Sequence, residues 1–387
     1  MPTVHLPTAQ RGVEAYRIGP ASPYAATASG DFPRLAYAAA HVVADPMADV
    51  APWQTVAVDW DATLAFRRHL WGLGFKIAEA MDTSQRGMGL DWPTARELIQ
   101  RSLAEARTIK GADLACGVGT DQLGDGAGAT LDAVRGAYEE QLEAVEAAGG
   151  RAILMASRAL ARAARSADDY LTVYGGLIRQ AKEPVILHWL GDMFDPRLAG
   201  YWGSTDVDAA TETVLALINE HRSRIAGIKI SLLEQEREVA LRRRLPPEVL
   251  MFTGDDFNYA ELIEGDAQGH SHALLGIFDP IAPAATAAFH ALGAGDHERY
   301  RAILAPTVPL SRKIFEAPTQ YYKAGVVFLA WLNGHQAHFA MIGGMQSARS
   351  PLHYADILRL ADRAALLRDP ELAAARMTQL MALHGIG

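Results

Sequence analysis

The chain has 387 residues, of which 50% are hydrophobic and 21% charged, so it can bury a large core and carries no compositional sign of disorder. The formal net charge of −9, without any concentrated basic segment, argues against a nucleic-acid or anionic-membrane surface. The single cysteine, Cys116, excludes a disulfide within the chain and a zinc site built from cysteines.

No apolar run approaches the roughly 18 to 20 residues that a membrane span needs. The first residues have neither the basic start nor the apolar core of a signal peptide. We therefore expect a cytoplasmic protein that binds neither membranes nor nucleic acid.

Residues 1–33 are rich in Pro, Ala, Gly and Ser without clear periodicity, which predicts an N-terminal arm. From residue 34 onward, short apolar segments alternate with amphipathic helical segments, a pattern typical of βα units and a parallel sheet. The predicted strands lie at 35–43, 75–81, 112–118, 151–156, 184–189, 225–231, 249–253 and 270–276.

Helix starts between these strands are marked by capping residues. Asp91, followed by Pro93, and Thr130 each precede a helical pattern, and Ser166 with Asp169 three residues later forms a capping box. Gly149 stands where the helix after Thr130 should end.

Eight strands with intervening helices predict a (β/α)8 TIM barrel over residues 34–296. Residues 297–387 contain several Ala- and Leu-rich helical stretches and are predicted to form a C-terminal helical extension.

Active sites of such barrels lie at the carboxyl ends of the strands, where polar residues interrupt otherwise apolar segments. This criterion selects a short set of candidates: His41, Asp82, Thr83, Ser84, His188, Lys229, Asp255, Asp256 and Ser271.

Lys229 is the most informative candidate, because only six of the 36 Lys and Arg residues are lysines and this one lies in the apolar segment IAGIKISLL. Desolvation inside a barrel would disfavour the ammonium form, lower the pKa from about 10.4 and leave an amine able to attack a carbonyl. A lysine at the edge of the sheet or in a salt bridge is equally compatible with this position.

The segment IAGIKIS, followed by LMFTGDDFNYAELIEG, resembles the sixth and seventh strands of the dihydrodipicolinate synthase and N-acetylneuraminate lyase family. EPVILHWLGD, GFKIAEAMDTSQRGMGLDWPTARELI and AQGHSHALLGIFDPIAP resemble its fifth strand, second βα unit and eighth strand. The matches follow the family's order over residues 34–335 and indicate a divergent branch. The resemblance implies that Lys229 forms an imine with the substrate.

The same resemblance places Thr83 and Ser84 on the family's paired threonines, which bind the substrate carboxylate and join a proton relay. Asp82 replaces the glycine before this pair, and Arg86 lies in the altered loop after it. A carboxylate at Asp82 would repel an anionic substrate unless a cation such as Arg86 compensates. We therefore assign Asp82 and Arg86 to substrate binding.

His188 occupies the position of the family's relay tyrosine. An imidazole, with an ordinary pKa near 6.5, can accept and donate protons at neutral pH, so His188 is the predicted acid and base. Ser271 matches a residue that lines the family's carbonyl pocket, and strict alternation would point His270 and His272 the other way. Asp255 is assigned either to substrate binding or to capping of a loop.

These assignments predict a Schiff-base-forming lyase, aldolase or dehydratase that acts on a 2-oxo acid or a sugar-derived carbonyl compound. Such chemistry requires no cofactor and no metal, because the imine itself acts as the electron sink. We expect a small-molecule substrate and a homo-oligomer, either a dimer or a tetramer.

Two alternatives remain open on the same barrel. One is a metal-dependent sugar isomerase or hydrolase, in which a divalent metal is bound by His41, Glu79, His188, Asp255 and a histidine of the eighth strand. The other is a ligand sensor that binds a carbonyl compound without turnover.

Overall fold

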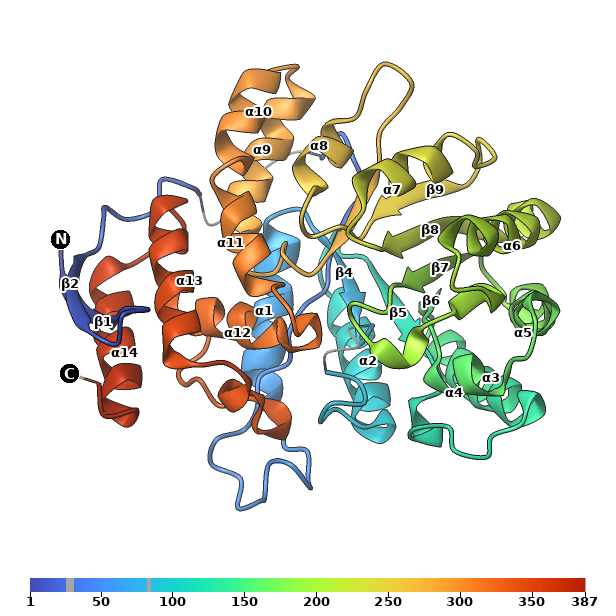
Figure 1. Cartoon of the computed structure of the whole chain (residues 1–387), viewed down its shortest axis with the longest axis horizontal. Helices are drawn as coiled ribbons and strands as arrows, with labels where there is room; N and C mark the ends of the chain where they lie inside the picture. Colours follow the sequence, from blue (N-terminus) through green and yellow to red (C-terminus); the bar gives the residue numbers. More distant parts are fainter. Residues whose placement is uncertain (26–30, 82–84, 387) are drawn as a thin grey trace. The chain divides into compact units, whose positions relative to one another are not determined.

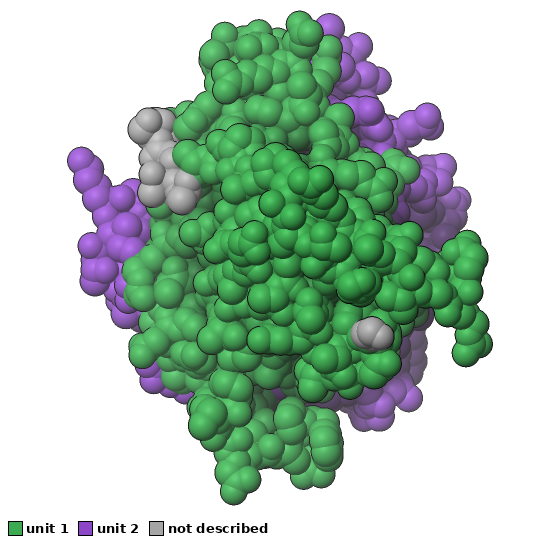
Figure 2. All heavy atoms as spheres, turned by 90° about the vertical axis from the view of Figure 1, so that its left-hand side faces the viewer, with its two compact units in different colours: residues 1–33, 41–75, 277–387 green, residues 34–40, 76–276 purple. Residues whose placement is uncertain are grey.

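The computed structural model describes residues 1–25, 31–81 and 85–386. The chain forms two compact units, coloured green and purple in Figure 2. Unit 1 consists of Met1–Pro33, His41–Phe75 and Ile277–Gly387, and unit 2 consists of Arg34–Ala40 and Lys76–Gly276. The proposed division into arm, barrel and extension at residues 33 and 296 stays a prediction.

Unit 2 contains a closed barrel of eight parallel strands, which confirms the predicted (β/α)8 fold (Figure 1). Each predicted segment contains or overlaps one strand, and the strands follow one another around the barrel in chain order. The strands are β3 (Ala36–Ala38), β4 (Lys76–Glu79), β5 (Leu114–Val118), β6 (Arg151–Leu154), β7 (Val185–Leu190), β8 (Ile225–Ser231), β9 (Leu250–Thr253) and β10 (His272–Leu275).

In the part of unit 2 that the structure describes, the helices that follow these strands are α2 (Trp92–Ala106), α3 (Leu131–Ala147), α4 (Arg158–Ala163), α5 (Ala167–Gln180), α6 (Val207–His221), α7 (Gln235–Arg242) and α8 (Tyr259–Glu264). The predicted caps are confirmed. The side chains of Asp91 and Thr130 accept hydrogen bonds from the backbone of α2 and α3, and Ser166 N donates to Asp169 Oδ2 at 3.2 Å. Gly149 follows α3 with a φ of +79°, a conformation that glycine adopts without strain.

The barrel interior is filled by side chains from alternate positions of its strands. The apolar cluster comprises Tyr37, Ala39, Ala78, Met81, Ala115, Ile153, Met155, Ile186, Phe252 and Leu274. Because side chains alternate along a strand, these residues identify the inward face of each one.

The described residues of unit 1 form an antiparallel hairpin and seven α-helices. The hairpin, β1 (Thr3–Pro7) and β2 (Val13–Arg17), differs from the irregular arm that the composition predicts. Its first strand alternates exposed and buried residues over so few positions that the period is hard to detect. The helices are α1 (Trp60–Gly72), α9 (Ala282–Gly293), α10 (His297–Leu304), α11 (Thr307–Ile314), α12 (Lys323–Leu332), α13 (Pro351–Arg363) and α14 (Pro370–Leu383).

The five helices from α10 onward lie within the predicted C-terminal helical extension. The N-terminal segment is bonded to one of them, because Tyr16 Oη and Gly19 N donate to the carboxylate of Asp362 on α13, at 2.7 and 2.9 Å. Among the described residues, none of the helices is long and apolar enough to cross a bilayer.

Two partly buried histidines of unit 1 lie against each other with tilted rings. The ring centroids of His69 on α1 and His335 lie 4.4 Å apart. Burial, with the charge of Arg368 as a further cause, lowers the pKa of His69 to about 4. Burial and the neighbouring His69 lower the pKa of His335 to about 3. Both rings are therefore neutral in the folded protein at neutral pH.

We expect these histidines to make the protein less stable in mild acid. Below their ordinary pKa of about 6.5 they take up protons in the unfolded chain but not in the folded one, so the free energy of unfolding falls by up to roughly 1.4 kcal/mol per histidine and pH unit. Urea unfolding between pH 7 and pH 5 measures this slope. The double variant His69→Asn/His335→Asn should show a shallower slope, whereas the exposed control His384→Asn should not.

Candidate active site

Lys229 lies on β8 and points into the barrel of unit 2. Its Cα pairs in register with those of His188 on β7 and Phe252 on β9. Residues in register on parallel neighbours face the same side of the sheet, and Phe252 belongs to the interior cluster. The lysine side chain is buried, and Nζ lies 3.9 Å from the sulfur of Met81. The amine therefore has the sheltered location that imine chemistry requires.

His188 is the neighbour of Lys229 on the inward face. It is buried, Nε2 lies 3.4 Å from Ser231 Oγ, and Nδ1 has no hydrogen-bond partner among the described residues. Burial, followed by the positive charge of Lys229, lowers the pKa of His188 well below its ordinary value. The imidazole is thus neutral at neutral pH and able to accept a proton.

Ser231 and Gly254 also lie beside Lys229, and neither was selected from the sequence. Ser231 follows Lys229 by two positions on β8, so the period of a strand places both on one face. Gly254 N donates to Ile230 O at 2.8 Å just after β9. A Cβ at Gly254 would lie 2.2 Å from Ser231 Oγ and 2.6 Å from Lys229 Cε, so the missing side chain makes room for both residues.

The predicted carboxylate-binding segment Asp82, Thr83 and Ser84 lies outside the described residues. Met81, which precedes it at the end of β4, is the residue whose sulfur approaches Nζ of Lys229.

Arg86 is buried, and every N–H group of its side chain is used within the protein. The guanidinium donates to the backbone oxygens of Ala80 and Gly117 and to the side chains of Asp121 and Gln141. These bonds leave no donor for a substrate. Arg86 therefore joins the loops after β4 and β5, in place of the expected substrate contact.

Ser271 does not lie where the carbonyl pocket was expected. It precedes β10 at the amino end of the barrel, and its hydroxyl donates to Glu238 Oε1 on α7 at 2.6 Å. His272 pairs in register with Phe252 and therefore faces inward, the reverse of the predicted alternation. Burial lowers the pKa of His272 to about 4.

Asp255 caps a loop, one of its two predicted roles. Its Oδ1 accepts from the backbone N–H of Phe257 at 2.8 Å and of Asn258 at 3.0 Å, and its Oδ2 accepts from Asn258 Nδ2.

His41 and Glu79, two of the residues proposed for a metal site, each bind different partners within the protein. His41, in unit 1, is bonded to Asp279 and Gln336, and Glu79, in unit 2, accepts from the backbone of Ala80. Within the described ranges, no group of three or more His, Cys, Asp or Glu side chains is arranged to hold a metal ion.

Comparisons with known proteins agree with this architecture. The family model described as "Protein of unknown function (DUF993)" matches residues 4–386. A search of curated proteins finds no match.

Among solved structures, dihydrodipicolinate synthase from Aquifex aeolicus has a TM-score of 0.65 at 13% identity and covers 86% of this chain and 99% of its own. YagE from E. coli K12, a prophage protein of the dihydrodipicolinic acid synthase family in complex with pyruvate, has a TM-score of 0.66 at 12% identity with the same coverage. The chloride-inhibited dihydrodipicolinate synthase from Acinetobacter baumannii, complexed with pyruvate, has a TM-score of 0.60 at 17% identity, again with 86% and 99% coverage. At these identities the likenesses show the fold.

Substitution of Gly254 should disturb the site locally. Gly254→Ala is expected to destabilise the protein by roughly 1–3 kcal/mol, because its Cβ would lie 2.6 Å from Ile230 O and even closer to Ser231 Oγ. Urea unfolding measures this loss. The control Gly136→Ala, on α3 with no atom within 4 Å of the new Cβ, should instead stabilise the protein by up to about 1 kcal/mol. Equal effects of the two substitutions would contradict the close packing around Lys229.

Proposed function

We propose that this chain, which belongs to the DUF993 family, is a Schiff-base-forming lyase of the aldolase type that acts on a 2-oxo acid or a sugar-derived carbonyl compound. The observation that carries the proposal is the position of Lys229, buried inside the barrel with His188 in register beside it. Fold alone is weak support for an activity, so the argument depends on these side chains.

In the proposed reaction, the amine of Lys229 attacks the substrate carbonyl, and water leaves as the iminium forms. The positively charged nitrogen then accepts the electron pair released when a neighbouring carbon loses a proton or when a carbon–carbon bond breaks. Hydrolysis of the imine returns the free lysine, so the sequence of steps needs no cofactor.

His188 has the properties of the required base. It is neutral because its pKa is lowered, it faces the same side as Lys229, and its Nδ1 has no hydrogen-bond partner among the described residues. Ser231 Oγ, 3.4 Å from Nε2, can orient the ring. A proton taken from the substrate can therefore be held on His188 and returned in a later step.

Two similar structures, YagE and the Acinetobacter baumannii enzyme, were solved in complex with pyruvate. We accordingly take a 2-oxo acid as the first substrate class to test. Thr83 and Ser84 remain the proposed carboxylate-binding and relay residues, with Asp82 beside them.

We also propose a cytoplasmic location and a homo-oligomer, either a dimer or a tetramer. Among the described residues, no helix is long and apolar enough to span a membrane.

Borohydride trapping tests the imine directly. With pyruvate and other 2-oxo acids, imine formation expels water and reduction adds two hydrogens, so Lys229 should gain the mass of the 2-oxo acid less one oxygen atom, located by peptide mass mapping. Lys229→Met should abolish the adduct, because it removes the amine that forms the imine, whereas the exposed control Lys110→Met should retain it. Labelling of another lysine, or none with any compound, would contradict the proposal.

The role of His188 predicts a particular pH dependence. Because its pKa lies well below 6.5, the base form persists through neutral pH, and exchange of the pyruvate methyl protons in D2O should decline only in more acidic solution. His188→Asn should slow this exchange by roughly 10²- to 10⁴-fold and remove the acidic decline. Proton NMR measures the exchange, with His384→Asn as the control. A decline centred at or above pH 6.5 would argue against His188 as the base.

A further inference from the structure

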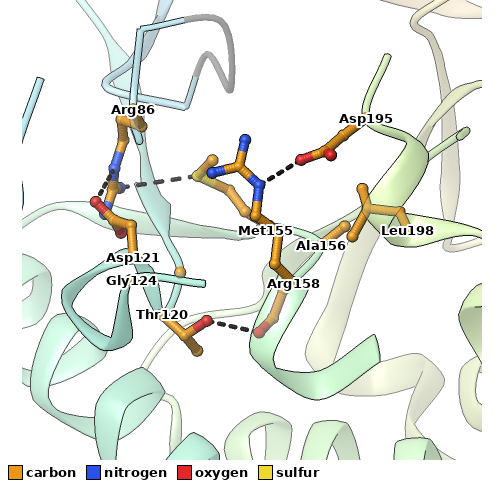
Figure 3. A pocket seen from close by; sticks show the side chains of 11 residues that line it. Arg86, Thr120, Asp121, Gly124, Met155, Ala156, Arg158, Asp195 and Leu198 are labelled. Atoms are coloured by element: carbon orange, nitrogen blue, oxygen red, sulfur yellow. Dashed lines mark hydrogen bonds and ion pairs between the residues drawn. The ribbon is translucent and has the colours of Figure 1, made fainter. Parts of the chain in front are cut away.

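A pocket lies at the carboxyl ends of β5, β6 and β7, within unit 2. Its lining includes Arg86, Thr120, Met155, Ser157, Arg158 and Asp195 (Figure 3). Since the carboxyl ends of the strands also carry the catalytic residues of such barrels, this pocket opens at the functional end. Arg86, which the sequence analysis assigned to substrate binding, lines this pocket, whereas Lys229 and His188 do not.

Arg158, the first residue of α4, extends into this pocket beside Met155 (Figure 3). Its side chain is only 16% exposed, and its Nε donates to Asp195 Oδ2. Neither Nη1 nor Nη2 donates a hydrogen bond to any residue that the structure describes. A Cβ at Gly87 would lie 2.5 Å from Nη1, so the glycine lets the guanidinium occupy this place. Arg158 therefore presents two donor groups that no described residue uses.

The charges around the pocket favour one bound negative charge. Arg86 is paired with Asp121, and its donors are fully used. Asp195 is shared between Arg158 and Arg197, whose Nε lies 3.0 Å from Oδ1. Within the lining, Arg86 and Arg158 balance Asp121 and Asp195, and Arg197, which is 54% exposed and lies outside the lining, adds one positive charge beside Asp195. A planar guanidinium matches a carboxylate in shape and charge, whereas a doubly charged phosphate would leave an excess negative charge.

The pocket and the lysine site share a wall. Met155 lines the pocket and also belongs to the barrel interior with Met81, whose sulfur lies 3.9 Å from Nζ of Lys229. The two methionines meet over Gly117, where a Cβ would lie 2.7 Å from Met155 Sδ and from Met81 Cα. Met155 therefore connects the lining of the pocket with the apolar residues beside Lys229.

We propose that Arg158 binds a carboxylate at the end of the substrate remote from the reacting carbonyl, so that the substrate is a 2-oxo diacid. This inference rests on the proposed imine at Lys229 for the direction of the substrate. The Thr120 and Ser157 hydroxyls, bonded to each other at the pocket wall, offer further polar contacts to the same carboxylate.

The test compares compounds that differ by one carboxylate. Isothermal titration calorimetry with Lys229→Met, which cannot form an imine, measures binding of 2-oxoglutarate, 2-oxoadipate and the monoacid 2-oxovalerate. At least one diacid should bind more tightly than the monoacid, and adding Arg158→Gln should reduce this preference on the order of 10- to 100-fold. Arg158→Lys, which keeps the charge but not the planar fork, should give an intermediate preference.

Arg162→Gln is the matched control, because it removes the same charge from an exposed position on α4. It should keep the full preference, and thermal unfolding checks that each variant is folded. Equal binding of diacids and monoacid, or a preference that survives in Arg158→Gln, would overturn the inference.

Borohydride trapping separates the two proposals. If diacid binding depends on Arg158 but Lys229 is not labelled, the carboxylate site at Arg158 is supported and the proposed lyase activity is contradicted. If Lys229 is labelled with the same diacid preference in wild type and in Arg158→Gln, the lyase activity is supported and the carboxylate site at Arg158 is contradicted.

Discussion

The register between β7 and β8 determines which side chains meet inside the barrel. His188 and Lys229 are paired in this register, so both point to the interior and neither can face the helices unless the strand slips. A slip of one residue would exchange the two faces and turn Ile228 and Ile230 inward. The proposed chemistry therefore depends on the hydrogen bonds between these two strands as much as on the side chains.

The environment that this register creates is apolar on one side and polar on the other. Met81 and Phe252 shield the lysine from water within the barrel, while Ser231 supplies a hydroxyl near His188. Burial disfavours a charged imidazole, so the histidine stays neutral beside a cation. His188 is therefore neutral, as a base must be, next to the nitrogen of Lys229 on which the proposed iminium would form.

Much of the barrel could be predicted from sequence, because its strands are short apolar runs bounded by caps and glycines. The inward position of Lys229 was predicted from the resemblance to the dihydrodipicolinate synthase family, because its apolar neighbours alone fit a lysine at the edge of the sheet equally well. The hairpin β1–β2 could not be predicted with the same ease, since only Val4 and Leu6 carry its alternation.

The wrong predictions at the site concern residues for which the local sequence pattern does not determine where the side chain points. Ser271 was assigned to the wrong face because the phase of alternation depends on where β10 begins, and this strand begins at His272. Arg86 was assigned to substrate because its partners Asp121 and Gln141 lie 35 and 55 positions away in the chain. Long-range partners of this kind become visible only when the loops are placed in space.

Arg158 and Lys229 are carried by different βα units, one following β6 and the other on β8. Their βα loops are separate segments of the chain, so one can change length or composition while the strand that holds the lysine stays intact. In a protein built this way, selection for a new substrate can act on the loops after β5, β6 and β7 alone. The covalent step would then be inherited unchanged while the preferred compound diverges.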